Sequence, residues 1–233
     1  MLTLDKNKPI IFLGDNHGDW NHLFYLIEKK RIEDCHLISV GDCGVGFENP
    51  QATEQQLKNL NNSFKERNIY FKAIRGNHDD PSYFKGSDRV CLSNFELIED
   101  YSVFEYDSKH IQFIGGAISI DRTGRTTGIS YWEDEGVVFK KNACQKVDVL
   151  VTHTAPSWCF PQQFNEIVYG WAREDAYLIE DLTDERGVMD EIFKLCSPRE
   201  HLYGHFHSSW SERIDRCTFK LLDINELWEY VNR

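Results

Sequence analysis

Short apolar runs recur along the first part of the chain, and each is followed, directly or after one residue, by glycine and then a polar residue. These runs span 9–13, 36–40 and 69–74. Each has the length of a buried strand, and the stretches between them carry apolar residues at helical spacing. The helices are expected at His22–Lys30, with Asp19 as its N-cap, and at Thr53–Asn68. Strand and helix in alternation predict a parallel sheet with helical crossovers, and therefore an α/β fold.

Past Pro81 the pattern changes to short strands, expected to be mostly antiparallel, at Val90–Leu92, Tyr101–Tyr106 and His110–Ile114. Val147–Val151 again has the pattern of a buried strand, and further strands are predicted at Leu202–Tyr203, Trp210–Ile214 and Thr218–Leu222. A short helix is predicted at Asn225–Val231. Residues 156–198 read as a cap-like insertion rich in aromatic and charged residues, with a helix at Glu185–Leu195. No linker or repeat interrupts 1–233, so one domain is expected.

Composition narrows the class of protein. Of the 233 residues 41% are hydrophobic, which suffices for a large core, but no apolar stretch approaches the ~20 residues that span a bilayer. The seven cysteines lack paired spacing, and the first residues lack the pattern of a secretory signal. We therefore expect a soluble, cytoplasmic protein with reduced thiols. A net charge of −12 argues against tight binding to long nucleic acid.

Acids, amides and imidazoles follow the apolar runs. This places them at the carboxyl ends of the expected strands, where parallel sheets bind ligands. They are Asp15, His17, Asp42, Asn77, His78, His153, His205 and His207. A single residue of this kind at a strand end more often caps or faces solvent. Together they form an oxygen- and nitrogen-rich set that suits Mn²⁺, Fe or Zn²⁺. One ion needs about four ligands, so the set is large enough for two ions sharing a carboxylate, an arrangement that clamps a phosphoryl group.

Five sequence blocks in this order resemble the calcineurin-like metallophosphoesterase superfamily. They are Asp15-Asn16-His17, Gly41-Asp42, Gly76-Asn77-His78-Asp79, His153 and Gly204-His205-Phe206-His207. The resemblance covers most of the chain. It implies a fold of two mixed β-sheets in a sandwich flanked by helices, four layers in all.

The resemblance also implies roles for these residues. The first metal ion is expected to be held by Asp15, His17 and His207. The second is expected to be held by Asn77, His153 and His205. Asp42 would bridge the two ions. His78 would donate a proton to the leaving oxygen, because an imidazole can do so near neutral pH. Asp79 is expected to hold His78 in the correct tautomer.

The second block departs from the serine/threonine protein phosphatases of this superfamily. Those enzymes continue it with a second aspartate and a phosphate-gripping arginine, both absent from Gly41–Gly46. Another group should then bind the phosphate. Arg122 and Arg125, in the glycine-rich stretch 115–125, are the first candidates, and Arg75 is a further one. The alternative is that 115–125 is a solvated surface loop.

The sequence therefore predicts a hydrolase that depends on two divalent metal ions. Its expected reaction is the hydrolysis of phosphomonoesters or small phosphodiesters by in-line attack of metal-bound hydroxide. Its expected partner is a small phosphorylated substrate. No association with a membrane is expected. One alternative is a metal-dependent nuclease, against which the acidic surface argues. Another is a non-catalytic protein-binding scaffold, against which the intact set of ligands argues.

Overall fold

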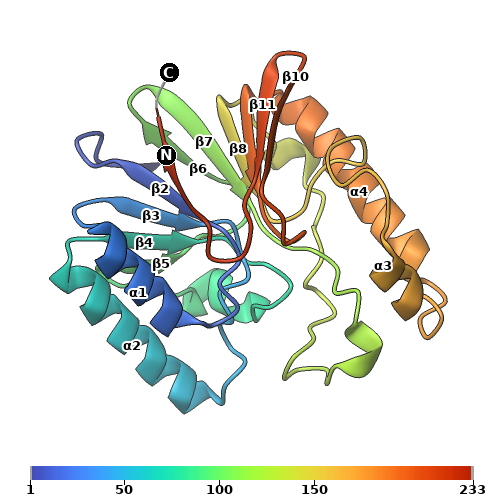
Figure 1. Cartoon of the computed structure of the whole chain (residues 1–233), viewed down its shortest axis with the longest axis horizontal. Coiled ribbons are helices and arrows are strands. Elements are labelled where there is room, and N and C mark those ends of the chain that lie inside the picture. Colours follow the sequence, from blue (N-terminus) through green and yellow to red (C-terminus); the bar gives the residue numbers. More distant parts are fainter. Residues whose placement is uncertain (1, 232–233) are drawn as a thin grey trace.

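Two β-sheets lie face to face, with helices on the outer side of each (Figure 1). The computed structural model describes residues 2–231. The seven-stranded sheet has the order β1 (Leu2–Thr3), β6 (Ser102–Tyr106), β7 (Lys109–Ile114), β8 (Val149–Thr152), β9 (Glu200–Tyr203), β11 (Cys217–Leu221) and β10 (Trp210–Ile214). The five-stranded sheet has the order β12 (Leu227–Tyr230), β2 (Ile10–Leu13), β3 (His36–Ser39), β4 (Tyr70–Ala73) and β5 (Phe95–Leu97). Both sheets contain parallel and antiparallel pairs, so the expected fold class is confirmed.

Four α-helices and several 3₁₀ turns complete the described residues. The α-helices are α1 (Trp20–Lys30), α2 (Pro50–Glu66), α3 (Glu166–Trp171) and α4 (Leu178–Cys196). The 3₁₀ turns are Pro81–Phe84, Gly86–Asp88, Arg122–Gly124 and Lys141–Ala143. Helices α1 and α2 cover the five-stranded sheet, and α4 covers the seven-stranded one (Figure 1). Over residues 2–231 we find no helix with the length and apolar character that crossing a membrane requires.

Side-chain alternation along the strands separates the core into layers. In β3, Leu37 packs toward α1 and α2, whereas Ile38 packs between the two sheets. In β8, Val149 and Val151 face the other sheet, whereas Leu150 packs against α4. Every residue of these two strands is buried because both faces of each strand are covered.

Local capping sets where the first two helices begin. The Asp19 side chain accepts a hydrogen bond from the His22 N–H at 3.1 Å, so the predicted N-cap is confirmed and α1 starts at Trp20. Asn49 caps α2 in the same way, and Pro50 occupies its first position. Proline is favoured at the first helical position because the N–H group of that residue has no hydrogen-bond partner within the helix. Proline therefore loses no helical hydrogen bond by lacking this group. Helix α2 therefore begins three residues before the expected Thr53.

The C-terminal segment corrects one prediction. Residues 225–231, expected as a helix, instead contain strand β12, which pairs antiparallel with β2. Trp228 and Tyr230 both lie against the ring of Phe12, with centroids 6.3 and 6.0 Å away. These aromatic contacts and the ladder to β2 outweigh a weak local preference for helix.

Two further segments differ from expectation. Val90–Leu92 is not a strand, since Cys91 makes only an isolated bridge to Glu96, and the edge strand is β5 instead. In the insertion, α4 begins at Leu178 rather than Glu185, and α3 was not predicted. Leu178 and Leu182 extend the buried face of α4 by two turns. The charged residues around them obscure this helical periodicity in the sequence.

We predict that Phe64→Ala lowers the free energy of unfolding by about 3–5 kcal/mol. Phe64 is fully buried and stacks on Phe71 with ring centroids 4.9 Å apart, so its removal leaves a cavity between α2 and the sheet. Denaturant unfolding measures the change. Tyr25→Ala is the control, because Tyr25 is 54% exposed on α1. A loss below about 1 kcal/mol for Phe64→Ala would contradict this packing.

Candidate metal centre

The seven expected metal ligands all follow the carboxyl ends of strands, and the structure brings them together. Asp15 follows β2, Asp42 follows β3 and Asn77 follows β4, whereas His153 follows β8, and His205 and His207 follow β9. The first three strands belong to one sheet and the last two to the other. The site therefore lies where the loops of both sheets meet, near the centre of the view in Figure 1.

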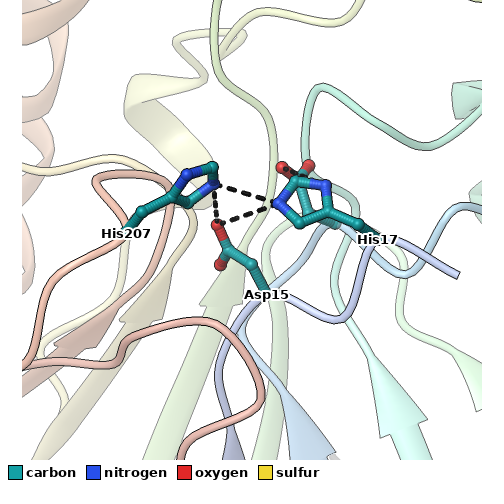
Figure 2. Close-up of side chains that lie close together, drawn as sticks. Asp15, His17 and His207 are labelled. Atoms are coloured by element: carbon teal, nitrogen blue, oxygen red, sulfur yellow. Dashed lines mark hydrogen bonds and ion pairs between the residues drawn. The ribbon is translucent and has the colours of Figure 1, made fainter. Parts of the chain in front are cut away.

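Four of these residues form a first group of donor atoms, namely Asp15, His17, Asp42 and His207. Figure 2 shows Asp15, His17 and His207 pointing toward one another. The Nε2 atom of His207 lies 3.3 Å from Asp15 Oδ2 and 3.0 Å from His17 Nε2. His17 Nδ1 lies 3.8 Å from Asp42 Oδ2.

Asp42, His153 and His205 form a second group, and Asn77 lies beside it. The Asn77 amide oxygen is 2.9 Å from His205 Nδ1 and 3.3 Å from His153 Nε2. Donor atoms within each group lie within 4.8 Å of one another. Ligands ~2.0–2.2 Å from one ion are at most roughly 4.4 Å apart. Each group therefore fits one metal ion after small adjustments, and Asp42 belongs to both groups.

The electrostatics around Asp42 favour cations. Burial of this carboxyl acts to raise its pKa, but the neighbouring imidazoles, His153 first, hold the pKa far below its ordinary value. Burial likewise acts to lower the pKa of His153, and Asp42, 3.2 Å away, overcomes this and raises the pKa to about 10. Asp42 thus favours the protonated form of His153, and that form in turn stabilises the buried carboxylate. A divalent ion at this place would displace that proton.

Hydrogen bonds orient the ligands. His153 Nδ1 lies 2.8 Å from the carbonyl oxygen of Val40, which suits an Nδ1–H donor and leaves Nε2 facing Asp42 and Asn77. The His205 backbone N–H donates to both Asp15 oxygens at 3.1 and 3.0 Å. The His78 N–H donates to Asp42 Oδ1 at 2.8 Å. Each carboxylate is thereby fixed by the backbone of another loop.

Several ligands have backbone conformations that non-glycine residues rarely adopt. Positive φ angles occur at His17 (50°), Asp42 (54°), His205 (70°) and His207 (44°). Such conformations cost of order 1–3 kcal/mol each and persist where the surroundings impose them. Here the N–H groups of Asn16 and His17 donate to the Asp42 carbonyl oxygen at 3.0 and 2.7 Å. Positive φ angles also occur elsewhere in the chain, but these four lie together on the loops that meet at the site.

Two glycines permit the close approach of these loops. A Cβ atom at Gly76 would lie 2.0 Å from Asp42 Oδ1, and one at Gly204 would lie 2.2 Å from Asp15 Oδ1. Neither distance is compatible with a side chain. The glycines of the third and fifth sequence blocks are thus required by the carboxylates that pack against them.

The contacts of Asp79 correct its expected role. Its carboxylate accepts backbone N–H bonds from Val45 at 2.9 Å, Gly76 at 2.8 Å and Cys43 at 3.1 Å. Burial raises its pKa to about 7, with Asp42 adding to the shift and these three bonds opposing it. Asp79 therefore ties the Asp42 loop to the Asn77 loop, and these bonds occupy the carboxylate that was expected to orient the His78 ring.

The His78 side chain lies beside the first group and is held on three sides. Its Nε2 atom is 2.7 Å from a terminal guanidinium nitrogen of Arg125. The ring of Phe47 is parallel to it at 5.7 Å, and His17 meets it edge-on at 4.6 Å. Burial lowers the pKa of His78 to about 4, Arg125 adds to this shift, and Asp42 opposes it. These surroundings therefore favour the neutral imidazole.

The three candidate arginines have different partners in the structure. Arg125 lies at the site, where it contacts His78 and donates to the Asn77 carbonyl oxygen at 3.3 Å. Arg122 instead pairs with Asp175 and Asp181 of the insertion, each at 2.5 Å. Its expected contact with substrate is not supported, because in the described residues its guanidinium contacts the insertion and not His78 or Asn77. Arg125 also pairs with an acid, Asp121 at 2.7 Å, but it borders the site.

Arg75 is a second correction among the arginines. It is 4% exposed, pairs with Asp100 at 2.9 Å and donates to the carbonyl oxygens of Glu135 and Gly136. Its guanidinium thus fastens the segment after β7 to the strand ends of the five-stranded sheet. A buried cation with these partners is not available to a substrate.

Sequence reasoning missed three residues around this centre. Phe47 follows a glycine-rich turn and has no periodic context that would indicate its stacking on His78. Ser119 and Glu135 lie in a segment without regular elements, yet both are buried and they connect to Asn77. Glu135 belongs to an acidic run, a pattern typical of a solvated surface. Its importance is indicated by its burial, which depends on tertiary structure and cannot be seen in the sequence.

Comparisons with known proteins agree with this geometry. The profile of the family described as calcineurin-like phosphoesterase matches residues 8–209. The chain therefore belongs to the calcineurin-like phosphoesterase family, as its sequence blocks indicate. A search of curated protein sequences found no match.

Several solved structures have a similar fold. A putative 5'-nucleotidase from Staphylococcus aureus, in complex with alpha-ketoglutarate, aligns with a TM-score of 0.51 and 12% identity over 94% of this chain and 49% of that chain. Phosphopantetheinyl hydrolase from Mycobacterium tuberculosis aligns with a TM-score of 0.48 and 11% identity over 97% of both chains. A predicted phosphoesterase from Streptococcus pneumoniae has a TM-score of 0.34 and 14% identity, with 93% and 72% coverage. At these identities the similarity concerns the fold, for which the first of the three gives support.

We predict that Gly204→Ala weakens Mn²⁺ binding by at least about 10-fold, the usual effect of disturbing the support of a metal ligand. The added Cβ must displace the Asp15 carboxylate, because it would lie 2.2 Å from Oδ1. Calorimetric titration of the metal-free protein measures the affinity. Gly187→Ala is the matched control, since a Cβ there meets no atom within 4 Å. Equal affinities for the two variants would contradict the prediction.

Proposed function

We propose that this protein is a dimetal phosphoesterase that hydrolyses phosphomonoesters or small phosphodiesters. The observation that carries the proposal is the sharing of Asp42 between two donor groups, each of which fits one ion. Family membership supports a hydrolase of this general kind. Manganese, iron or zinc suits the donor set, which is made of imidazole, carboxylate and amide.

In this proposal Asp15, His17 and His207 hold the first ion and Asp42 bridges to the second. Asn77, His153 and His205 complete the second site. When bound, two such ions polarise phosphoryl oxygens and lower the pKa of water. Two aspartates leave two divalent ions with a formal excess of positive charge. The centre would therefore attract a phosphate group although the protein as a whole carries a charge of −12.

Arg125 and His78 complete the reaction site. We assign Arg125 to the phosphate, because a guanidinium suits phosphate oxygens and this one borders both donor groups through His78 and the Asn77 carbonyl. His78 is assigned as proton donor to the leaving oxygen. A phosphate that engages Arg125 would draw it away from His78 Nε2, and the nearby anionic charge would raise the pKa of the imidazole.

The insertion at 156–198 belongs to the same proposed single domain. Its long helix α4 packs on the seven-stranded sheet, and Arg122 links the Arg125 loop to Asp175 and Asp181. Gly124 of that loop lies against the ring of Trp171, close enough that an added Cβ would be 3.4 Å from it. We propose that the part of the insertion before α4 caps the reaction site through these contacts.

The direct test is hydrolysis of a generic phosphomonoester and a generic phosphodiester by the metal-free protein after addition of Mn²⁺, Fe²⁺ or Zn²⁺. We expect turnover only with metal and its loss on chelation. No turnover of either ester with any of the three ions, in a protein that binds them, would overturn the proposed reaction.

We predict that Asp42→Asn weakens both ions together, because one carboxylate serves both groups. Titration with Mn²⁺ measures the stoichiometry and the affinities. Asp34→Asn is the control, since Asp34 is a carboxylate on the surface whose side chain is 62% exposed. Loss of one ion with the other unchanged would contradict the bridging role.

We predict that His78→Ala lowers turnover by ~10²–10⁴-fold while both ions stay bound, the usual contribution of a general acid. A leaving group with a low pKa should lose less rate than an alkyl ester, because it departs without a proton. His22→Ala is the control, since His22 is exposed on α1. Equal losses for activated and alkyl esters would remove His78 from the proton-donor role.

A further inference from the structure

The Asn77 side chain faces a problem that the other expected ligands do not. Its amide carries an oxygen and an NH₂ group of nearly the same shape, and only the oxygen can bind a cation. In the structure the oxygen faces His205 and His153, at 2.9 and 3.3 Å. A rotation of the amide by half a turn would present two N–H donors there instead.

The opposite side of the amide is fixed by a buried hydroxyl. Asn77 Nδ2 donates to Ser119 Oγ at 3.1 Å, and Ser119 is fully buried. Because the hydroxyl oxygen accepts this bond, the hydroxyl group can donate its own hydrogen bond to another acceptor. The position of this hydroxyl depends in turn on what holds the backbone of Ser119.

Glu135 holds the backbone of Ser119. Its Oε1 accepts the Ser119 backbone N–H at 2.6 Å, and the residue is 2% exposed. Burial raises the pKa of Glu135 to about 7, and bonds from the backbone and the hydroxyl of Ser119 oppose the rise. Its Oε2 atom is buried without a hydrogen-bond partner among the described residues.

A neighbouring carboxylate provides a contrast. Glu185 of α4 is also buried, and its two oxygens accept backbone N–H bonds from Val137 and Ile118, both at 3.2 Å. It braces the same segment of chain but makes no hydrogen bond to Ser119 or Asn77. An acid that is buried beside this segment therefore does not necessarily contact Ser119 or Asn77.

We propose that Ser119 and Glu135 are positioning residues that keep the amide oxygen of Asn77 directed at the second metal ion. The inference rests on the proposed function, since it assumes that Asn77 is a metal ligand. It adds to that function a chain of contacts, Asn77 to Ser119 to Glu135, from a segment that carries none of the metal-binding sequence blocks.

The test is calorimetric titration of the metal-free full chain with Mn²⁺. The unmodified protein should bind two ions. Ser119→Ala should lose about 10–100-fold in affinity for one ion and keep the other, the usual effect of removing a partner that orients a ligand. Thermal unfolding of the metal-free variant checks that the fold is retained.

A double substitution separates orientation from a general structural effect. In Asn77→Asp both terminal atoms are oxygens, so the direction of the side chain no longer matters. Adding Ser119→Ala to that variant should then cause little further loss of affinity. A further loss as large as in the unmodified background would overturn the positioning role.

The two buried acids supply a matched pair. Glu135→Gln should weaken the same ion as Ser119→Ala, whereas Glu185→Gln should leave both affinities near those of the unmodified protein. Equal losses for the two glutamine variants would overturn the inference.

The failures of the two proposals are distinguishable. If the unmodified protein binds fewer than two ions, the proposed function fails, and this inference fails with it. If it binds two ions and Ser119→Ala does the same with unchanged affinities, the inference alone is overturned.

Discussion

The buried carboxylate of Asp42 is the constraint around which the other strand-end loops are arranged. It is 1% exposed, and a charge at that depth is stable only beside compensating charge or strong donors. His153 and the His78 backbone N–H supply these in the metal-free protein. The geometry also demands a glycine at position 76, because a side chain there would overlap the carboxylate.

Buried acids also hold the loops that carry the ligands. Loops at strand ends have no ladder partners, so their N–H groups need acceptors from elsewhere. Asp79 accepts three of them, Asp15 accepts that of His205, and Glu135 and Glu185 accept those of the segment after β7. The acidic composition of the protein thus includes internal supports as well as a solvated surface.

The departure of the second sequence block from protein phosphatases has a physical counterpart. In place of an extended motif with an arginine, the turn after Asp42 donates the N–H groups of Cys43 and Val45 to Asp79. The arginine beside the metal centre comes from much later in the chain, at Arg125. Arg122 anchors that loop to the insertion, so the proposed phosphate contact and the proposed cap are mechanically connected.

Local sequence patterns were sufficient to predict the α/β class, most of the strands, the cap of α1 and the set of residues that gather at the strand ends. These follow from local periodicity and from residue types placed directly after buried strands, which a linear pattern records. Tertiary structure decided the strand at β12, the partners of Arg75, Arg122 and Asp79, and the burial of Ser119 and Glu135. Each of these depends on which distant segment packs alongside, and a charged residue reads the same in sequence whether it faces water or a buried partner.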